Sequence, residues 1–166
     1  FVMKTNNGSG DVIICRDKSE FDIRSAKKQI TSLFSREFGV LSGEPHYGLI
    51  KPCIIAEELL DSSTQPCSPN SLIDYKIWCF GGEPAFTMCC SNRTPESLEL
   101  SVYDLDWKYL PETIRITSHY KRPKEPIPRP ASYDRMLDIA RLLSAGFPEV
   151  RVDLYDPLLN IYRMGE

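Results

Sequence analysis

The stretch FVMKTNNGSGDVIIC, residues 1–15, organises the rest of the chain. Two apolar runs flank a turn rich in Asn, Gly and Ser, which is the pattern of a β-hairpin. Lys4 stands where the first strand ends. Consecutive backbone N–H groups in such a loop can form an anion-binding nest, and the lysine adds a positive charge. The stretch therefore predicts a phosphate site, although a plain hairpin with a surface lysine fits the same residues.

Length and composition narrow the class of protein. The 166 residues suffice for one compact domain or two small lobes, and 42% hydrophobic with 26% charged residues is typical of a globular protein. A net charge of −3 without a basic stripe argues against nucleic-acid binding. We expect no transmembrane segment, since no apolar run is long enough. The chain opens and stops inside apparent strands, which predicts a fragment.

The six cysteines lack the spacing of a zinc site or a C-x-x-C redox pair. Most lie within apolar runs, where a free cysteine behaves as a small hydrophobic residue. This usage predicts a reducing, cytoplasmic compartment. A structural or redox role for Cys89 and Cys90 is the alternative interpretation.

In the first part of the chain, an amphipathic helix is predicted from Ser19 onward, with Ser19 and Asp22 as its cap. Residues 39–47 are predicted to be loop. A short strand at 53–56 runs into two glutamates and two leucines, and a polar loop or connection follows. The apolar positions of the helix recur at three- and four-residue spacing: Ile23, Ala26, Ile30, Leu33, Phe34 and Phe38.

In the second part, residues 72–80 and 84–90 flank a Gly-Gly-Glu turn and predict a second hairpin. Asp74 and Lys76 fall on one face of its first strand, because side chains alternate with period two. Residues 111–130 are rich in Pro and basic residues. They predict a cover over a site, ordered or mobile, that stays outside the core, or simply a solvated loop. A helix is predicted over 131–145, with one apolar face: Met136, Leu137, Ala140 and Leu143.

The tail predicts two strands, 150–155 and 161–166. If Tyr155 pairs with Tyr162, Asp153 and Glu166 share one face of the sheet, next to Arg151. Two carboxylates placed in this way can hold Mg²⁺ while phosphates complete its coordination. The alternative is a pair of surface acids on an edge hairpin.

Taken in order, these parts resemble the TupA-like ATP-grasp family, which is linked to bacterial cell-surface polysaccharide and teichuronopeptide synthesis. The resemblance implies an α+β fold of two small lobes of antiparallel sheet plus helices, without the N-terminal subdomain. It implies a central lobe over 1–60 and a C-terminal lobe over 61–166. The segments that carry it are FVMK at 1–4, NNGSG at 6–10, DYK at 74–76, CFGG at 79–82, YDLDW at 103–107, FPEVRVD at 147–153 and GE at 165–166.

The resemblance also implies roles for individual residues. Asp74 would reach the ribose, Lys76 would face phosphate or substrate, and Arg151 would face the transferred phosphoryl group. Asp153 and Glu166 would bind Mg²⁺. The residues implied to contact the rest of ATP are Lys4, Asn7, Gly8, Ser9 and Gly10 at the phosphates and Ile55, Glu57, Glu58 and Leu60 along the adenine.

The implied activity is an ATP- and Mg²⁺-dependent carboxylate–amine ligase that works through an acylphosphate. Its substrates would be sugar-acid or amino-acid units of a surface polymer, handled in the cytoplasm at the inner face of the membrane. The alternatives are an ATP-grasp kinase, a partner in a glycosyltransferase pathway, or a non-catalytic nucleotide-binding module.

Overall fold

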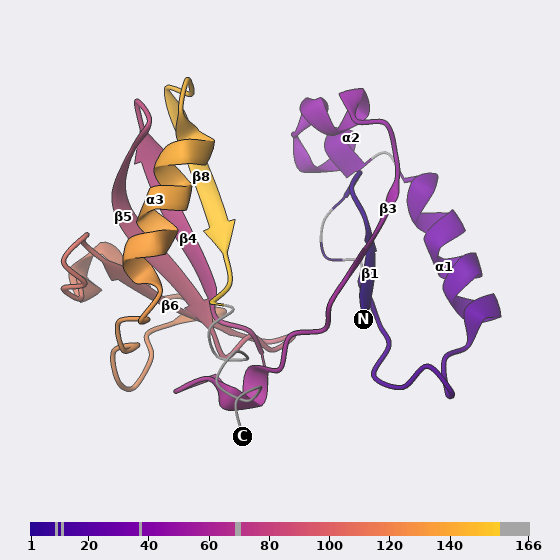
Figure 1. The fold of residues 1–166 in the computed structure, drawn as a ribbon, viewed down its shortest axis with the longest axis horizontal. Coiled ribbons are helices and arrows are strands. Elements are labelled where there is room, and N and C mark those ends of the chain that lie inside the picture. Colours follow the sequence, from indigo (N-terminus) through magenta and orange to yellow (C-terminus); the bar gives the residue numbers. More distant parts are fainter. Residues whose placement is uncertain (9, 11, 37, 69–70, 157–166) are drawn as a thin grey trace. The chain divides into compact units, whose positions relative to one another are not determined.

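The computed structural model describes residues 1–156 except 9, 11, 37, 69 and 70. Its contacts divide the chain into two compact units, Phe1–Leu59 and Leu60–Glu166. Each unit holds one sheet and at least one helix (Figure 1). The predicted α+β class is confirmed.

The first unit is built on a three-stranded antiparallel sheet. β1 (Val2–Thr5) lies in the centre, between β2 (Val12–Ile14) and β3 (Ile54–Glu57). The hairpin predicted from the first fifteen residues is present, and Lys4 lies opposite Val12 on one side and Ile55 on the other. The loop that follows β1 therefore leaves from the middle of the sheet.

Helix α1 (Ile23–Phe34) packs beside β1 and buries Ala26, Ile30 and Leu33. Its N-cap is Asp22, whose carboxylate accepts hydrogen bonds from the backbone N–H groups of Arg24 and Ser25. The predicted capping role of Ser19 is wrong, since its hydroxyl donates to Asp17 instead. The helix also ends four residues before Phe38.

The segment predicted as loop forms two short helices, α2 (Phe38–Ser42) and the 3-10 helix η1 (Pro45–Leu49). They are joined tightly, because the backbone N–H of Glu44 donates to the Gly39 carbonyl at 2.8 Å. A Cβ atom on Gly39 would lie 2.4 Å from the Glu44 carbonyl oxygen. Only glycine permits this approach.

The second unit holds a five-stranded sheet in the order β7-β6-β5-β4-β8. The β4–β5 hairpin turns at Gly81 and Gly82, whose φ angles of 58° and 88° match the positive values of a type I′ turn. The pairings are antiparallel except for β7, which runs parallel to β6. The strands are β4 (Asp74–Phe80), β5 (Glu83–Ser91), β6 (Leu98–Tyr103), β7 (Tyr120–Lys121) and β8 (Glu149–Leu154). This unit also contains two 3-10 helices, η2 (Ser62–Thr64) and η3 (Pro111–Thr113).

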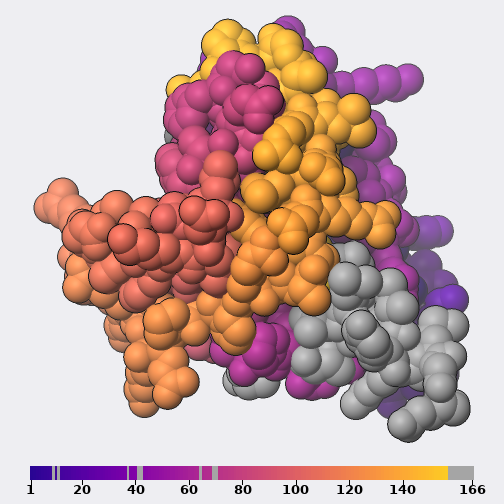
Figure 2. Space-filling model, turned by 60° about the vertical axis from the view of Figure 1, so that its left-hand side comes forward, coloured from indigo at the N-terminus to yellow at the C-terminus, as the bar shows by residue number. Residues whose placement is uncertain are grey.

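Helix α3 (Tyr133–Ser144) covers one face of this sheet and contacts β4, β5 and β8. The orange and yellow surface of Figure 2 shows α3 and β8 side by side. The predicted apolar face is wrong at Leu143, which is 55% exposed, because the buried stripe continues through Ser144. The core between the helix and the sheet contains Tyr75, Ile77, Cys79, Cys89, Tyr103 and Val152, together with Tyr133, Met136 and Ala140 of α3 itself.

Trp107 joins this core through its ring. It stacks on Tyr103, with ring centroids 4.4 Å apart and planes 8° apart, and meets Tyr133 edge-on at 4.5 Å. The turn that positions it is held by the Asp104 carboxylate, which accepts from the backbone N–H groups of Asp106 and Lys108. The acidic-aromatic YDLDW segment is therefore structural at Asp104 and Trp107.

The Pro-rich segment 111–130 is attached to the core. Ile127 is 2% exposed; its N–H donates to the Tyr103 hydroxyl at 2.6 Å, and its carbonyl accepts from the Trp107 indole at 2.9 Å. Ile114 is also buried. The expectation that this segment stays outside the core is wrong at these two isoleucines.

Across the part of the chain that the structure describes, no helix has the length and apolarity to cross a membrane.

Candidate functional site

Four charged side chains gather on the face of the second sheet that lies opposite α3. Asp74 and Lys76 alternate along β4, and Arg151 and Asp153 alternate along β8. The β4–β8 register places Lys76 directly opposite Asp153. The shared face predicted for Asp74 and Lys76 is confirmed, and the pairing of β8 with β4 adds Arg151 and Asp153 to it.

The four charges alternate in sign and are in direct contact. The Lys76 ammonium lies 2.6 Å from the Asp74 carboxylate and 2.5 Å from that of Asp153. Arg151 holds both Asp153 oxygens, with Nε at 2.6 Å and Nη2 at 2.9 Å. The Lys76 side chain is only 13% exposed, whereas Arg151 is 42% exposed. We call this group the charged face.

Trp78 positions the arginine. It lies two residues after Lys76 on β4, directly opposite Arg151, and its ring lies 5.8 Å from the guanidinium carbon. A stacked contact with Phe86 on β5 supports the indole from the side. Sequence reasoning missed Trp78, although period-two alternation from Lys76 would have placed it on this face.

The charged face changes the pKa of its members. Burial favours the neutral form of Asp153, but hydrogen bonds from Arg151 and Lys76 outweigh burial and lower the pKa of the carboxyl. Burial likewise opposes the charge on Lys76, and its bonds to Asp153 and Asp74 outweigh that effect and raise its pKa. The Asp153 hydrogen bond is the main cause that raises the pKa of Arg151. All three groups are therefore charged near neutral pH.

These shifts predict how stability depends on pH. Asp153 stabilises the fold above its ordinary pKa of 3.8, and this contribution is lost as the pH falls through its lowered value. Lys76 stabilises the fold below its ordinary pKa of 10.5, and this contribution is lost as the pH rises through its raised value. As the pH falls from about 4 to 2, the free energy of unfolding measured with urea should decrease less in Asp153→Asn than in the parent. Asp134→Asn, at an 80% exposed position, is the control and should follow the parent. Equal acid slopes in all three proteins would contradict the role of Asp153.

The first unit carries a second group of predicted site residues. The Lys4 ammonium lies 2.8 Å from the Glu57 carboxylate, and both side chains are partly exposed. Asn6 ties the loop after β1 to the entry of β3: its side chain accepts from the Cys53 N–H at 2.8 Å and donates to the Lys51 carbonyl. Sequence reasoning missed Asn6, whose role depends on the β1–β3 pairing.

The remaining predicted residues are distributed between the units. Ile55 is half-buried on β3 and Glu58 is exposed just beyond it, whereas Leu60 begins the second unit. In the loop after β1, Asn7 is buried and Gly10 has a φ of +85°. Ser9, Glu166 and the predicted strand 161–166 lie outside the described residues.

Of the two predicted Mg²⁺ ligands, Asp153 and Glu166, only Asp153 lies among the described residues. Asp153 offers the oxygen ligands that Mg²⁺ prefers, and Mg²⁺ is commonly held by one or two carboxylates plus substrate phosphates, so its chemistry fits. Both of its oxygens already accept hydrogen bonds from Lys76 or Arg151. No group of three or more metal-binding side chains occurs among the residues that the structure describes.

Three cysteines of the second unit, Cys67, Cys89 and Cys90, are protonated thiols near neutral pH. Burial is the main cause that raises the pKa of Cys67, Cys89 and Cys90. All six cysteines are free. These thiols therefore act as small apolar side chains, and the charged face has no thiolate nucleophile in Cys89 or Cys90.

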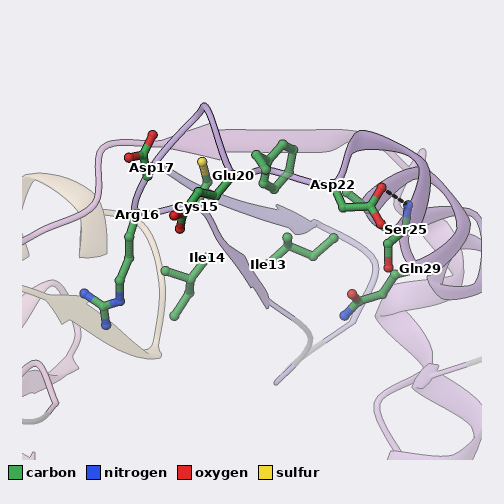
Figure 3. Close-up of a pocket in the computed structure, with 11 residues that line it drawn as sticks. Ile13, Ile14, Cys15, Arg16, Asp17, Glu20, Asp22, Ser25 and Gln29 are labelled. Carbon is green, nitrogen blue, oxygen red and sulfur yellow. Dashed lines mark hydrogen bonds between the residues drawn. The ribbon is translucent and has the colours of Figure 1, made fainter.

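An open pocket of about 410 Å³ lies between β2 and the start of α1 (Figure 3). Two of its three acids bond to the local backbone: Asp22 accepts from the Ser25 N–H, drawn as a dashed line, and Asp17 accepts from the Ser19 N–H. At this pocket, Asp22 therefore acts as the N-cap of α1.

The described residues thus hold a lysine beside a Gly-bearing loop on the first sheet and a face of alternating charges on the second sheet. The chain belongs to the TupA-like ATP-grasp family, whose model matches residues 1–166. This membership confirms the resemblance seen in the sequence and indicates an ATP-grasp-type role. A comparison with curated proteins gives no significant match, and a comparison with solved structures gives none either.

Proposed function

We propose that this protein is an ATP- and Mg²⁺-dependent carboxylate–amine ligase that works through an acylphosphate. Its substrates are sugar-acid or amino-acid units of a bacterial surface polymer, joined in the cytoplasm at the inner face of the membrane. The observation that carries the proposal is the charged face of Asp74, Lys76, Arg151 and Asp153 in a chain of this family.

In the proposal, the first unit binds the nucleotide. Lys4 and the backbone N–H groups of residues 7–10 bind the phosphates, since consecutive N–H groups and a lysine favour anions. Glu57 holds Lys4 in place through the 2.8 Å ion pair until phosphate arrives. The adenine lies along Ile55, Glu57 and Glu58 of this unit and along Leu60, the first residue of the second unit.

The second unit supplies charge to the reacting phosphoryl group. Lys76 and Arg151 face its oxygens, where two fixed cations stabilise the charge that develops in the transition state. Asp74 reaches the ribose. Asp153 and Glu166 hold Mg²⁺, which neutralises phosphate charge when bound.

The proposed chemistry has two steps. A substrate carboxylate oxygen attacks the γ-phosphorus and the bond to ADP breaks, which gives an acylphosphate and ADP. The amine nitrogen of the second substrate then attacks the acyl carbon, and inorganic phosphate leaves as the amide forms. The protein contributes positioning and charge rather than a covalent intermediate of its own.

Hydroxylamine tests the acylphosphate directly. The protein is incubated with ATP, Mg²⁺, hydroxylamine and either glucuronate or glutamate, and ADP, phosphate and hydroxamate are measured. A ligase forms all three in equal amounts. Formation of ADP and a stable phosphorylated product without hydroxamate would identify a kinase instead. ATP binding without any ADP would identify a non-catalytic nucleotide-binding module.

Lys4→Ala is expected to weaken ATP binding by about 1–3 kcal/mol, the range for a lost charge-assisted hydrogen bond. Isothermal titration calorimetry of the parent and the variant measures this difference. Lys27→Ala, at an exposed position of α1, is the control and should bind ATP as the parent does. Equal ATP affinity in the parent and Lys4→Ala would remove Lys4 from the phosphate site.

A further inference from the structure

The charged face has no net positive charge, although the proposed function requires its cations to receive phosphate. Lys76 lies between the carboxylates of Asp74 and Asp153. Arg151 holds the Asp153 carboxylate through two nitrogens. The two positive and two negative charges therefore sum to zero. Glu149 lies on the same face of β8 and adds one more negative charge. A phosphate group that approaches this face meets cations whose charge is already balanced.

Of the two carboxylates in the charged face, that of Asp153 occupies both cations. Its Oδ1 accepts from Arg151 Nε at 2.6 Å, and its Oδ2 accepts from Arg151 Nη2 at 2.9 Å and from Lys76 Nζ at 2.5 Å. Among the described residues, Asp74 contacts Lys76 but not Arg151. The Asp153 side chain is also more accessible, at 36% exposed against 16% for Asp74. Asp153 is therefore the carboxylate with which an incoming anion has to compete.

The contact between Asp153 and Arg151 uses the geometry by which arginine binds phosphate. Carboxylate and phosphate groups both bind an edge of the guanidinium through two parallel N–H···O bonds. The Nε–Nη2 edge of Arg151 is taken by Asp153. The remaining N–H groups of Arg151 lie beside the same carboxylate, whose charge repels an anion. Asp153 therefore opposes an anion whichever of these donors the anion uses.

This contact can open without any movement of the sheet. Arg151 and Asp153 are two residues apart on β8, and their side chains are 42% and 36% exposed. A change of side-chain rotamer is enough to separate two exposed side chains of one strand. Trp78 approaches the guanidinium from β4, with its ring 5.8 Å from the guanidinium carbon. Arg151 therefore keeps a contact on the face of the sheet when Asp153 leaves it.

We propose that Asp153 is an internal competitor of phosphate, which holds Arg151 and Lys76 until a phosphate group displaces it. A phosphate ion alone then binds weakly, because the competing carboxylate is always next to the cations. That the phosphate belongs to ATP rests on the proposed function, whereas the competition itself does not. In the proposed function Asp153 also holds Mg²⁺. Release of the two cations and binding of the metal would then use the same carboxylate, so phosphate and Mg²⁺ would raise each other's affinity by the same factor.

NMR titration of the full chain with pyrophosphate in metal-free buffer measures this competition without turnover. The Nε–H signal of Arg151 reports binding at the guanidinium, and the amide signals of the loop after β1 report binding in the first unit separately. Asp153→Asn keeps the shape and removes the charge. It should lower the Kd of pyrophosphate at Arg151 at least about tenfold, because a full negative charge is removed at contact distance. Asp153→Ser, a smaller neutral replacement, should act in the same direction.

Glu149→Gln is a matched control. Glu149 also lies two residues from Arg151 on β8 and on the same face, but it is exposed and makes no ion pair with a described residue. Its substitution removes one negative charge from the same strand without removing a contact. Because an exposed charge is screened by water and salt, the Kd should change less than about threefold.

The outcomes separate this inference from the ligase proposal. Tighter pyrophosphate binding in both Asp153 variants, or binding seen only in them, supports the competition even if no hydroxamate forms, provided that Glu149→Gln follows the parent. Equal Kd values in the parent and the Asp153 variants overturn it, and so does weaker binding in these variants. Equal tightening by Glu149→Gln also overturns it, because net charge rather than the contact would then decide. Absence of shifts at Arg151 in all four proteins overturns it as well. Hydroxamate formation together with an unchanged Kd would keep the ligase and remove the competition.

Discussion

Replacing Lys76 by methionine is expected to lower ATP-dependent turnover at least a hundredfold and to destabilise the second unit by about 1–3 kcal/mol. The methionine keeps the length of the side chain but removes the cation that joins Asp74 to Asp153 at 2.6 and 2.5 Å. Two carboxylates would then share a partly buried face with Arg151 alone. Hydroxamate formation measures the turnover, and urea unfolding measures the stability.

Arg141→Met is a matched control for this change. Arg141 also contacts two carboxylates, Glu83 and Asp138, but these acids are 73% and 77% exposed. Exposed ion pairs contribute little, so the control should lose less than about 1 kcal/mol and keep its turnover. Equal destabilisation by both substitutions would show that the charged face behaves as an ordinary surface network. Normal turnover in Lys76→Met would exclude Lys76 from the proposed chemistry.

Ile127→Ala is expected to destabilise the second unit by about 2–4 kcal/mol, the usual cost of truncating a buried isoleucine. Ile127 is 2% exposed and belongs to the core under α3. Its backbone also bonds to Tyr103 and Trp107. Removing the side chain therefore leaves a cavity where the Pro-rich segment is anchored. Urea unfolding followed by circular dichroism measures the loss.

Ile116→Ala provides the comparison within the same segment. Ile116 is 47% exposed, so its truncation should change stability by less than about 0.5 kcal/mol. A large difference between the two isoleucines would confirm that the segment is attached at Ile127. Equal small effects would mean that this segment contributes little to the core, as its composition alone predicts.

Short sequence patterns correctly predicted the hairpins and the side-chain alternation within a strand. The Gly-rich turn predicted the β1–β2 hairpin. Gly81 with Gly82 predicted the β4–β5 hairpin, because the positive φ angles of a two-residue turn favour glycine. Period-two alternation placed Asp74 and Lys76 on one face. These features depend on residues close together in the sequence.

Features that depend on contacts between distant parts of the chain could not be predicted from the sequence. The charged face forms because β8 pairs with β4, about 75 residues earlier in the chain, and no local pattern encodes that register. Ile127 looked solvated, since its neighbours are prolines and basic residues, yet its burial depends on the distant Tyr103 and Trp107. Asn7 was predicted from its loop, and its burial depends on α2 and η1, which the sequence pattern had assigned to loop.

Trp78 and Trp107 are the only two tryptophans of the chain, and they lie in different surroundings. Trp107 sits among tyrosines in the core, whereas Trp78 lies against the Arg151 guanidinium. The fluorescence of each tryptophan therefore reports on a different part of the second unit. In a Trp78→Phe variant, the remaining emission follows the unfolding of the core. In a Trp107→Phe variant, it follows the electric field around Arg151, so an anion arriving at that guanidinium gives an optical signal without any added label.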